Sequence, residues 1–144
     1  EQHMDNQLQQ AVLAAAAIKK LREIHQNFVT NLATPAIECP EIGTLKGSLD
    51  SIECSCLERN IVVLSRPIVR DKQIRVLEYD FVTQWKDEEL SVLRLYLQPG
   101  GVLTRDPLGN EKLCDFNNTY IHRIILAALS ESLLNSPVYA PIEG

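Results

Sequence analysis

The feature that most constrains the fold is an unbroken amphipathic segment near the start of the chain. Residues 5–32 contain neither Gly nor Pro, and their apolar side chains recur at intervals of three and four residues. This spacing is typical of an α-helix with one apolar side, and the alanines at 14–17 have the highest helix propensity. We therefore predict a helix over 5–32. At ~1.5 Å per residue it is about 40 Å long, so we expect part of it to project from the domain.

The pattern changes to the alternation typical of β-strands in the middle of the chain. Pro35 and Pro40 end the helical region, and an irregular connection is expected through Gly43 and Gly47. We predict an antiparallel sheet of about five strands over 44–105, the first of them within 51–56. An alternative also fits that first segment, because the apolar residues Leu45, Leu49, Ile52 and Cys56 have helical spacing.

Turn residues set the expected strand boundaries. We predict turns at Arg59–Asn60, at Asp71–Lys72, at the acidic cluster 87–89 and at 99–101. Pro67 interrupts the strand between the first two turns, which indicates a sheet edge or a bulge. The stretch 106–118 is rich in Pro, Gly and Asn and is predicted to be a loop.

The predicted fold class is α+β in two layers, with both helices on one face of the sheet. The second helix is expected over 118–135, where isoleucines and leucines recur at helical spacing, and a loose tail over 136–144. Residues 1–3 are interpreted as a tag remnant before Met4. Because apolar residues occur on both faces of the strand 90–97, we expect a partner to cover part of the second face.

Size and charge exclude several classes of protein. The chain has 144 residues, of which 45% are hydrophobic, and a net charge of −5, which suits one globular domain. The acidic balance argues against general nucleic-acid binding. No run reaches the ~20 apolar residues of a membrane span, and the residues after Met4 lack a basic secretory start. We expect a cytoplasmic protein that binds neither nucleic acid nor membrane.

The four cysteines are expected to be free thiols. Cys54 and Cys56 lie two apart on a predicted strand, so both face one side, and with Cys39 or Cys114 they would supply zinc ligands. Structural zinc sites usually combine two closely spaced pairs, which this sequence lacks. We therefore expect no metal and no cofactor.

No known catalytic motif occurs in the sequence. It contains no Gly-x-Ser-x-Gly elbow, no His-Glu-x-x-His, no phosphate loop and no dinucleotide fingerprint. The two histidines on predicted helices, His25 and His122, are interpreted as surface residues. If a pocket exists between sheet and helices, its polar lining is expected to include Arg94, Cys114, Tyr120 and His122.

Charge is uneven along the second predicted strand and the start of the third. Arg66, Arg70 and Arg75 belong to a basic stretch of an otherwise acidic chain. They are a candidate anion-binding patch. The alternative is that these charges protect an exposed sheet edge from pairing with other chains.

The long first helix is the strongest indication of function. Its alanines allow close approach of another backbone, and we predict a self-association surface at Leu8, Val12, Ala15, Ala16 and Ile18. The alternative is that the helix packs lengthwise on its own sheet. We predict a non-enzymatic, homodimeric protein-interaction module, since small acidic secretion chaperones, adaptors and immunity proteins have a loosely similar layout. The alternative function is a small-molecule-binding or enzymatic domain.

Overall fold

A computed structural model describes residues 2–34, 39–49 and 51–140. The elements are α1 (Gln2–Ala33), β1 (Gly43–Ser48), β2 (Ser51–Cys56), β3 (Arg59–Arg70), β4 (Gln73–Trp85), β5 (Glu88–Leu97), β6 (Val102–Thr104), β7 (Lys112–Asp115) and α2 (Ile121–Leu134). Within these residues the seven strands form one antiparallel sheet, in which each strand pairs with its neighbours along the chain. Of the predicted tag remnant at 1–3, residue 1 lies outside the described residues and residues 2 and 3 belong to α1. Of the tail predicted over 136–144, the part at 141–144 lies outside the described residues.

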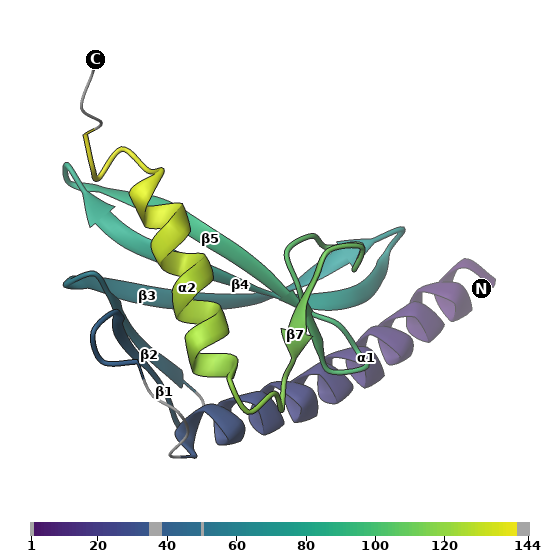
Figure 1. Cartoon of the computed structure of the whole chain (residues 1–144). Helices are drawn as coiled ribbons and strands as arrows, with labels where there is room; N and C mark the ends of the chain where they lie inside the picture. Colours follow the sequence, from purple (N-terminus) through teal and green to yellow (C-terminus); the bar gives the residue numbers. More distant parts are fainter. Residues whose placement is uncertain (1, 35–38, 50, 141–144) are drawn as a thin grey trace.

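The core lies between the curled sheet and the two helices. Figure 1 shows α2 crossing one face of the sheet. The C-terminal end of α1 lies beside β1 and near the start of α2, and the N-terminal end of α1 extends away from the sheet. Fully buried side chains come from α1, from the central strands and from α2, because each presents its apolar row to the same space. They include Phe28, Leu32, Tyr79, Phe81, Leu95, Leu97, Leu103, Ile121, Ile125, Leu129 and Leu133. The predicted α+β class with a helix at each end is confirmed.

The predicted number of about five strands is wrong, because β1 and β7 were assigned to irregular structure. In β1 the two glycines are required by close backbone contacts. A Cβ atom on Gly43 would lie 2.0 Å from the Ser55 carbonyl oxygen, and one on Gly47 would lie 2.0 Å from that of Val29. Glycine is normally unfavourable inside a strand. The two glycines therefore indicated irregular structure, although tertiary contacts require them here.

Strand β7 lies inside the stretch 106–118 that was predicted to be a loop. The Asp106 carboxylate accepts hydrogen bonds from the backbone N–H groups of Asn110 (3.1 Å) and Glu111 (2.7 Å). This closes a tight turn, after which Lys112–Asp115 pairs with β6. The Pro, Gly and Asn residues of this segment therefore predict the turn correctly, but they do not reveal the short strand β7 that follows it.

The hairpin turns are only partly where the sequence predicted them. The turn at Asp71–Lys72 is confirmed. The turn predicted at Arg59–Asn60 is instead at Leu57–Glu58, and the one predicted at 87–89 is at Lys86–Asp87. All six residues have positive φ between 50° and 65°, as two-residue turns between twisted strands require. Because none is glycine, their sequence signal is weak.

The edge position of Pro67 is confirmed. β2 pairs with β3 only as far as Val62, so the rest of β3 bonds to β4 alone, and a bulge follows at Ile68/Val69. The alternative helix through Leu45 and Cys56 is wrong, because these residues belong to β1 and β2.

Neither helix in the described part of the chain is long and apolar enough to span a membrane.

Candidate interaction surface

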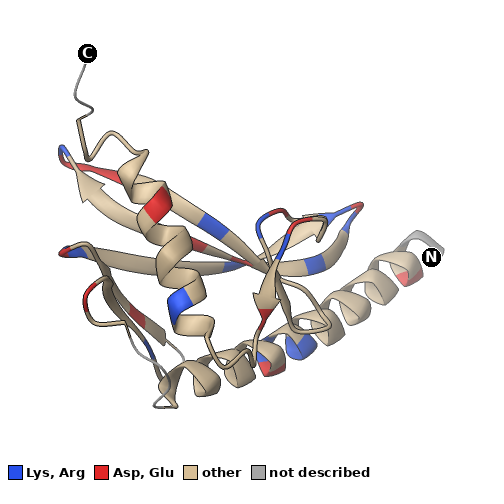
Figure 2. Cartoon of the chain, in the orientation of Figure 1, with Lys and Arg blue, Asp and Glu red and all other residues tan. Residues whose placement is uncertain are grey.

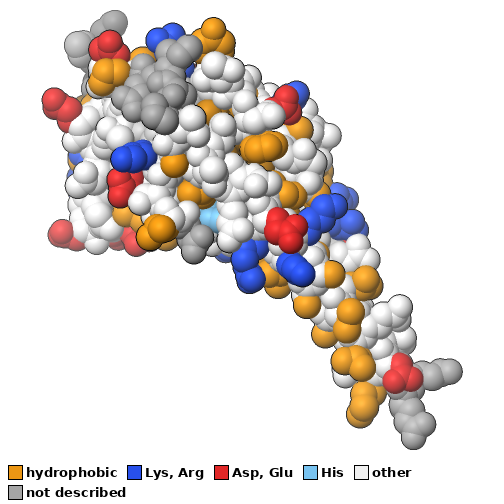
Figure 3. All heavy atoms as spheres, turned by 90° about the horizontal axis from the view of Figure 1, so that it is seen from below, with side chains coloured by type: hydrophobic (Ala, Val, Ile, Leu, Met, Phe, Trp, Pro, Cys, Tyr) orange, Lys and Arg blue, Asp and Glu red, His pale blue; other side chains and the backbone are white. Residues whose placement is uncertain are grey.

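The two halves of α1 have different surroundings. From Leu21 onward the helix is anchored in the domain, with Leu21, Phe28, Val29 and Leu32 buried. Before Leu21, every residue whose side chain is described is exposed except the half-buried Ala14 and Ala17. Figure 3 shows this first half as an arm that leaves the body of the molecule and carries hydrophobic side chains along its length.

The arm has two rows of apolar residues, one facing the domain and one pointing away from it. Ala14, Ala17, Leu21, Ile24 and Phe28 follow one another at helical spacing and form the row that faces the domain. A second row has Met4 exposed to 70%, Leu8 to 64% and Val12 to 60%. The second row, together with Ala11, Ala15 and Ile18, is named the exposed stripe. At 3.6 residues per turn the centres of the two rows lie roughly 160° apart, so the domain cannot cover both.

The structure thus separates the residues that the sequence grouped as a self-association surface. Leu8, Val12, Ala15 and Ile18 belong to the exposed stripe, whereas Ala16 is exposed at its margin. Met4 and Ala11 also belong to the stripe and were missed. Their signal was the heptad-like spacing 4, 8, 11, 15 and 18, which is typical of a helix that pairs with another helix.

Charge along the arm is ordered. Asp5 lies in the first turn of α1, and Lys19, Lys20 and Arg22 lie near the point where the helix reaches the domain. Figure 2 shows the acidic colour near the N-terminal end of α1 and the basic colour farther along. The exposed stripe is therefore bounded by opposite charges at its two ends.

Polar bonds hold the second half of α1 in place. His25 Nδ1 lies 2.6 Å from the Tyr79 hydroxyl, and the Asn31 amide donates to the Phe116 carbonyl oxygen at 2.8 Å. His122 Nε2 bonds the Leu32 carbonyl oxygen at 3.0 Å. The interpretation of His122 as a surface residue is wrong, because its side chain is needed to bond the end of α1 and is 4% exposed. His25, also expected at the surface, is half-buried.

The four residues expected to line a pocket are not brought together. Arg94 lies on the outer face of the sheet, where it pairs with Asp80 at 3.6 Å, whereas His122 faces the core from α2. Cys114 is buried in β7 and Tyr120 is largely exposed. Only His122 lines the small cavity between β1 and α2, beside Cys39 and Leu126. The Nδ1 atom of His122 has no hydrogen-bond partner among the described residues.

The cysteine side chains are free thiols. Burial raises the pKa of Cys54 to about 12 and that of Cys56 and Cys114 to about 11, so these three stay protonated near neutral pH. Within the described residues, no three His, Cys, Asp or Glu side chains gather in a way that suits a metal ion.

The three arginines of the candidate anion patch differ in how strongly they are paired with carboxylates. Arg66 Nε donates to Glu78 Oε1 at 2.8 Å, and this bond raises the pKa of the arginine. Arg70 reaches only Asp71, at 3.9 Å, and both side chains are exposed. Arg75 makes no ion pair within the part of the chain that the structure describes. Glu78 thus pairs with Arg66 on β3 and Asp80 pairs with Arg94 on β5, and the Glu78 side chain is buried.

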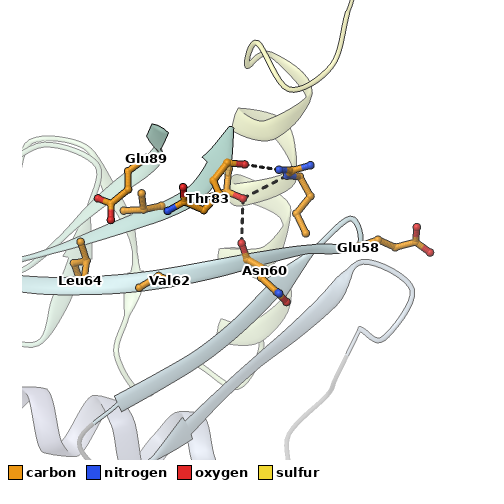
Figure 4. A pocket seen from close by; sticks show the side chains of 9 residues that line it. Glu58, Asn60, Val62, Leu64, Thr83 and Glu89 are labelled. Carbon is orange, nitrogen blue, oxygen red and sulfur yellow. Dashed lines mark hydrogen bonds between the residues drawn. The ribbon is translucent and has the colours of Figure 1, made fainter. Parts of the chain in front are cut away.

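The outer face of the sheet carries a shallow pocket of about 320 Å³ over β3 and β4. Val62 and Leu64 expose apolar side chains on its floor. Figure 4 shows Thr83 beside them, accepting from Arg59 at 3.3 Å and donating to the Asn60 carbonyl oxygen at 3.0 Å. These bonds fix the end of the β2–β3 hairpin, where Glu58 lines the margin of the pocket (Figure 4). The face is therefore partly apolar, as the sequence indicated.

Comparison with known proteins identifies no relative: no family model matches the chain, and neither a curated protein nor a solved structure matches it significantly.

Proposed function

We propose that this chain is a non-enzymatic protein-interaction module that forms a homodimer through the exposed stripe of α1. The observation that carries the proposal is the placement of Met4, Leu8 and Val12 on a projecting helix, on the side opposite the row that packs on the domain. Exposed apolar area of this kind is costly in water and is typical of an interface.

The occupant we propose for the stripe is the same stripe of a second copy, in antiparallel orientation. When two arms cross near Val12, Asp5 of one copy lies level with Lys19 of the other, and the same pair repeats by symmetry. A parallel pair would instead place Asp5 beside Asp5 and Lys19 beside Lys19. Ala11 and Ala15 let the two backbones approach closely, and antiparallel arms keep the two domains at opposite ends.

The small-molecule alternative has less support. The cavities between sheet and helices, where this alternative expects the pocket, have volumes of about 80 Å³ (β1 and α2) and about 230 Å³ (α1 and the β3–β4 hairpin), whereas ligand pockets usually have ~300–1,000 Å³. The polar residues expected around a pocket point to different sides of the sheet. The free state of the cysteines supports the cytoplasmic location that we also propose. A role as chaperone, adaptor or immunity protein remains part of the proposal.

The test is the solution mass, measured by light scattering across a dilution series in reducing buffer. We expect a dimer for the unaltered chain and a monomer for Leu8→Glu, with an unchanged circular-dichroism spectrum because Leu8 touches little of its own domain. Leu134→Glu is the matched control, since this leucine is 60% exposed on α2, and it should remain dimeric. A monomeric unaltered chain at every concentration would contradict the proposal.

A further inference from the structure

A second surface, separate from the arm, has the features of a peptide-binding groove. It lies between the far end of the β3–β4 hairpin and the segment 98–108, and has a volume of about 690 Å³. Its floor includes Ile68 and the buried Val76, and its rims carry Val69 and Leu108, which are 61% and 57% exposed. Large apolar side chains on both rims of an open groove indicate contact with another molecule.

One rim is held rigid by a network of hydrogen bonds. The Asp106 carboxylate binds two backbone N–H groups of the loop, and these bonds lower its pKa. Thr104 Oγ1 donates to the Asp106 carbonyl oxygen at 2.7 Å, and the Gln98 amide donates to Thr104 at 3.1 Å. Gly109 completes the turn with a φ of 80°. Leu108 is therefore presented to solvent by an ordered loop, so little entropy is lost when a ligand binds it.

The other rim is positively charged. Arg70 and Arg75 line the groove together with Asp71, which leaves a net charge of +1 from these three side chains. The Arg70–Asp71 pair is long, at 3.9 Å, and fully open to water, so solvent screens it strongly. Arg75 has no ion pair among the described residues. Figure 2 shows basic positions on the strands near the tip of the β3–β4 hairpin and an acidic position at the tip itself.

We infer that this groove binds a short acidic segment of a partner protein that also carries apolar side chains. The apolar side chains would pack between Val69 and Leu108, and the carboxylates would bind the guanidinium groups of Arg70 and Arg75, which suit planar carboxylates. Arg66 takes no part, because Glu78 already occupies its Nε. This site does not depend on the self-association proposed for α1.

The test uses a fluorescein-labelled decapeptide in which leucine and aspartate alternate, with binding followed by fluorescence anisotropy at low salt. We expect saturable binding that weakens at least about tenfold in the double variant Arg70→Glu, Arg75→Glu. Leu108→Ser should weaken binding by a similar factor. Arg123→Glu is the matched control, because Arg123 is exposed on α2, and it should bind the peptide as the unaltered chain does.

Two comparison peptides separate charge from apolar contact. A peptide of alternating leucine and lysine, and one of alternating serine and aspartate, should both bind much more weakly. The inference is overturned if the peptide fails to bind at millimolar concentration, if the double variant binds it equally well, or if only dodecanoate binds with the same dependence on Arg70 and Arg75. Repeating the titration with Leu8→Glu shows that the groove works without the dimer.

Discussion

His25 Nδ1 and the hydroxyl oxygen of Tyr79 lie 2.6 Å apart, and this contact joins the middle of α1 to the centre of β4. The two rings are stacked with centroids 5.7 Å apart, and Phe28 packs against the same tyrosine at 5.2 Å. The contact lies where α1 changes from an exposed arm to a buried core helix. Burial raises the pKa of Tyr79, so the phenol remains a neutral partner of the histidine.

We predict that Tyr79→Phe lowers the free energy of unfolding by about 1–2 kcal/mol, because it removes this hydrogen bond at a buried hydroxyl group. Urea denaturation measures the change. A double-mutant cycle with His25→Ala should show coupling, whereas Tyr120→Phe, at an exposed position, should change stability by less than about 0.5 kcal/mol. Additive effects of the two core substitutions would contradict the prediction.

The close contact of β1 with α1 gives a second prediction. Gly47→Ala would place a Cβ atom 2.0 Å from the Val29 carbonyl oxygen, where backbone must move to make room. We expect a loss of about 2–4 kcal/mol, in the range of severe overpacking, measured by thermal unfolding. Gly100→Ala is the control, since nothing lies within 4 Å of its added Cβ. Equal stability of the two variants would show that the contact is not tight.

The antiparallel arrangement of the arms makes a prediction about charge. Asp5→Lys alone and Lys19→Asp alone should each weaken the dimer by about tenfold at low salt, because each creates two like-charge pairs per dimer. The double substitution Asp5→Lys, Lys19→Asp should restore the dimer, because it exchanges the two charges and each pair again joins a basic and an acidic residue. Sedimentation equilibrium measures all three constants. A double variant as weak as the single ones would exclude the antiparallel arrangement.

The buried thiols predict a loss of stability at alkaline pH. In the unfolded chain they have a pKa near the ordinary 9.0, but burial raises the pKa of Cys114 to about 11. The native state therefore keeps a proton that the unfolded state loses. The stability is complete below pH 9 and decreases between pH 9 and 11, by about 1.4 kcal/mol per pH unit for each such thiol.

Denaturation at several pH values checks this slope. Cys114→Ser and Cys56→Ser should each reduce the slope, because burial raises the pKa of both thiols to about 11. Near pH 8, Ellman's reagent should modify Cys54, Cys56 and Cys114 only slowly in the native protein, because reactivity requires an accessible thiolate. Rapid modification of all the cysteines without unfolding would contradict the burial of these side chains.

Much of the fold was predictable because its signals are local. The helix over 5–32 was predicted nearly to its observed ends, and the strand predicted over 90–97 coincides with most of β5. Periodicity alone determines such features, since a helix or strand repeats its environment every few residues. The turn at Asp71–Lys72 was also marked by its residue types.

The features that were missed depend on residues distant in sequence. The glycines of β1 serve contacts with Ser55 and Val29, and β7 follows a turn closed by Asp106. His122 was placed at the surface because nothing near it in sequence indicates a bond to Leu32, which lies 90 residues away. The groove beside Leu108 likewise combines a hairpin tip with a loop from another part of the chain.

Helix propensity and periodicity act within a few turns, so local sequence was enough to predict α1 as a long helix with an apolar side. Which of its apolar residues the domain covers depends on contacts with distant elements. Leu21, Phe28 and Leu32 are buried because they face the domain, whereas Met4, Leu8 and Val12 lie on the side of α1 that the domain does not cover. Burial depends on which surfaces meet, and that is set by the packing of the whole chain.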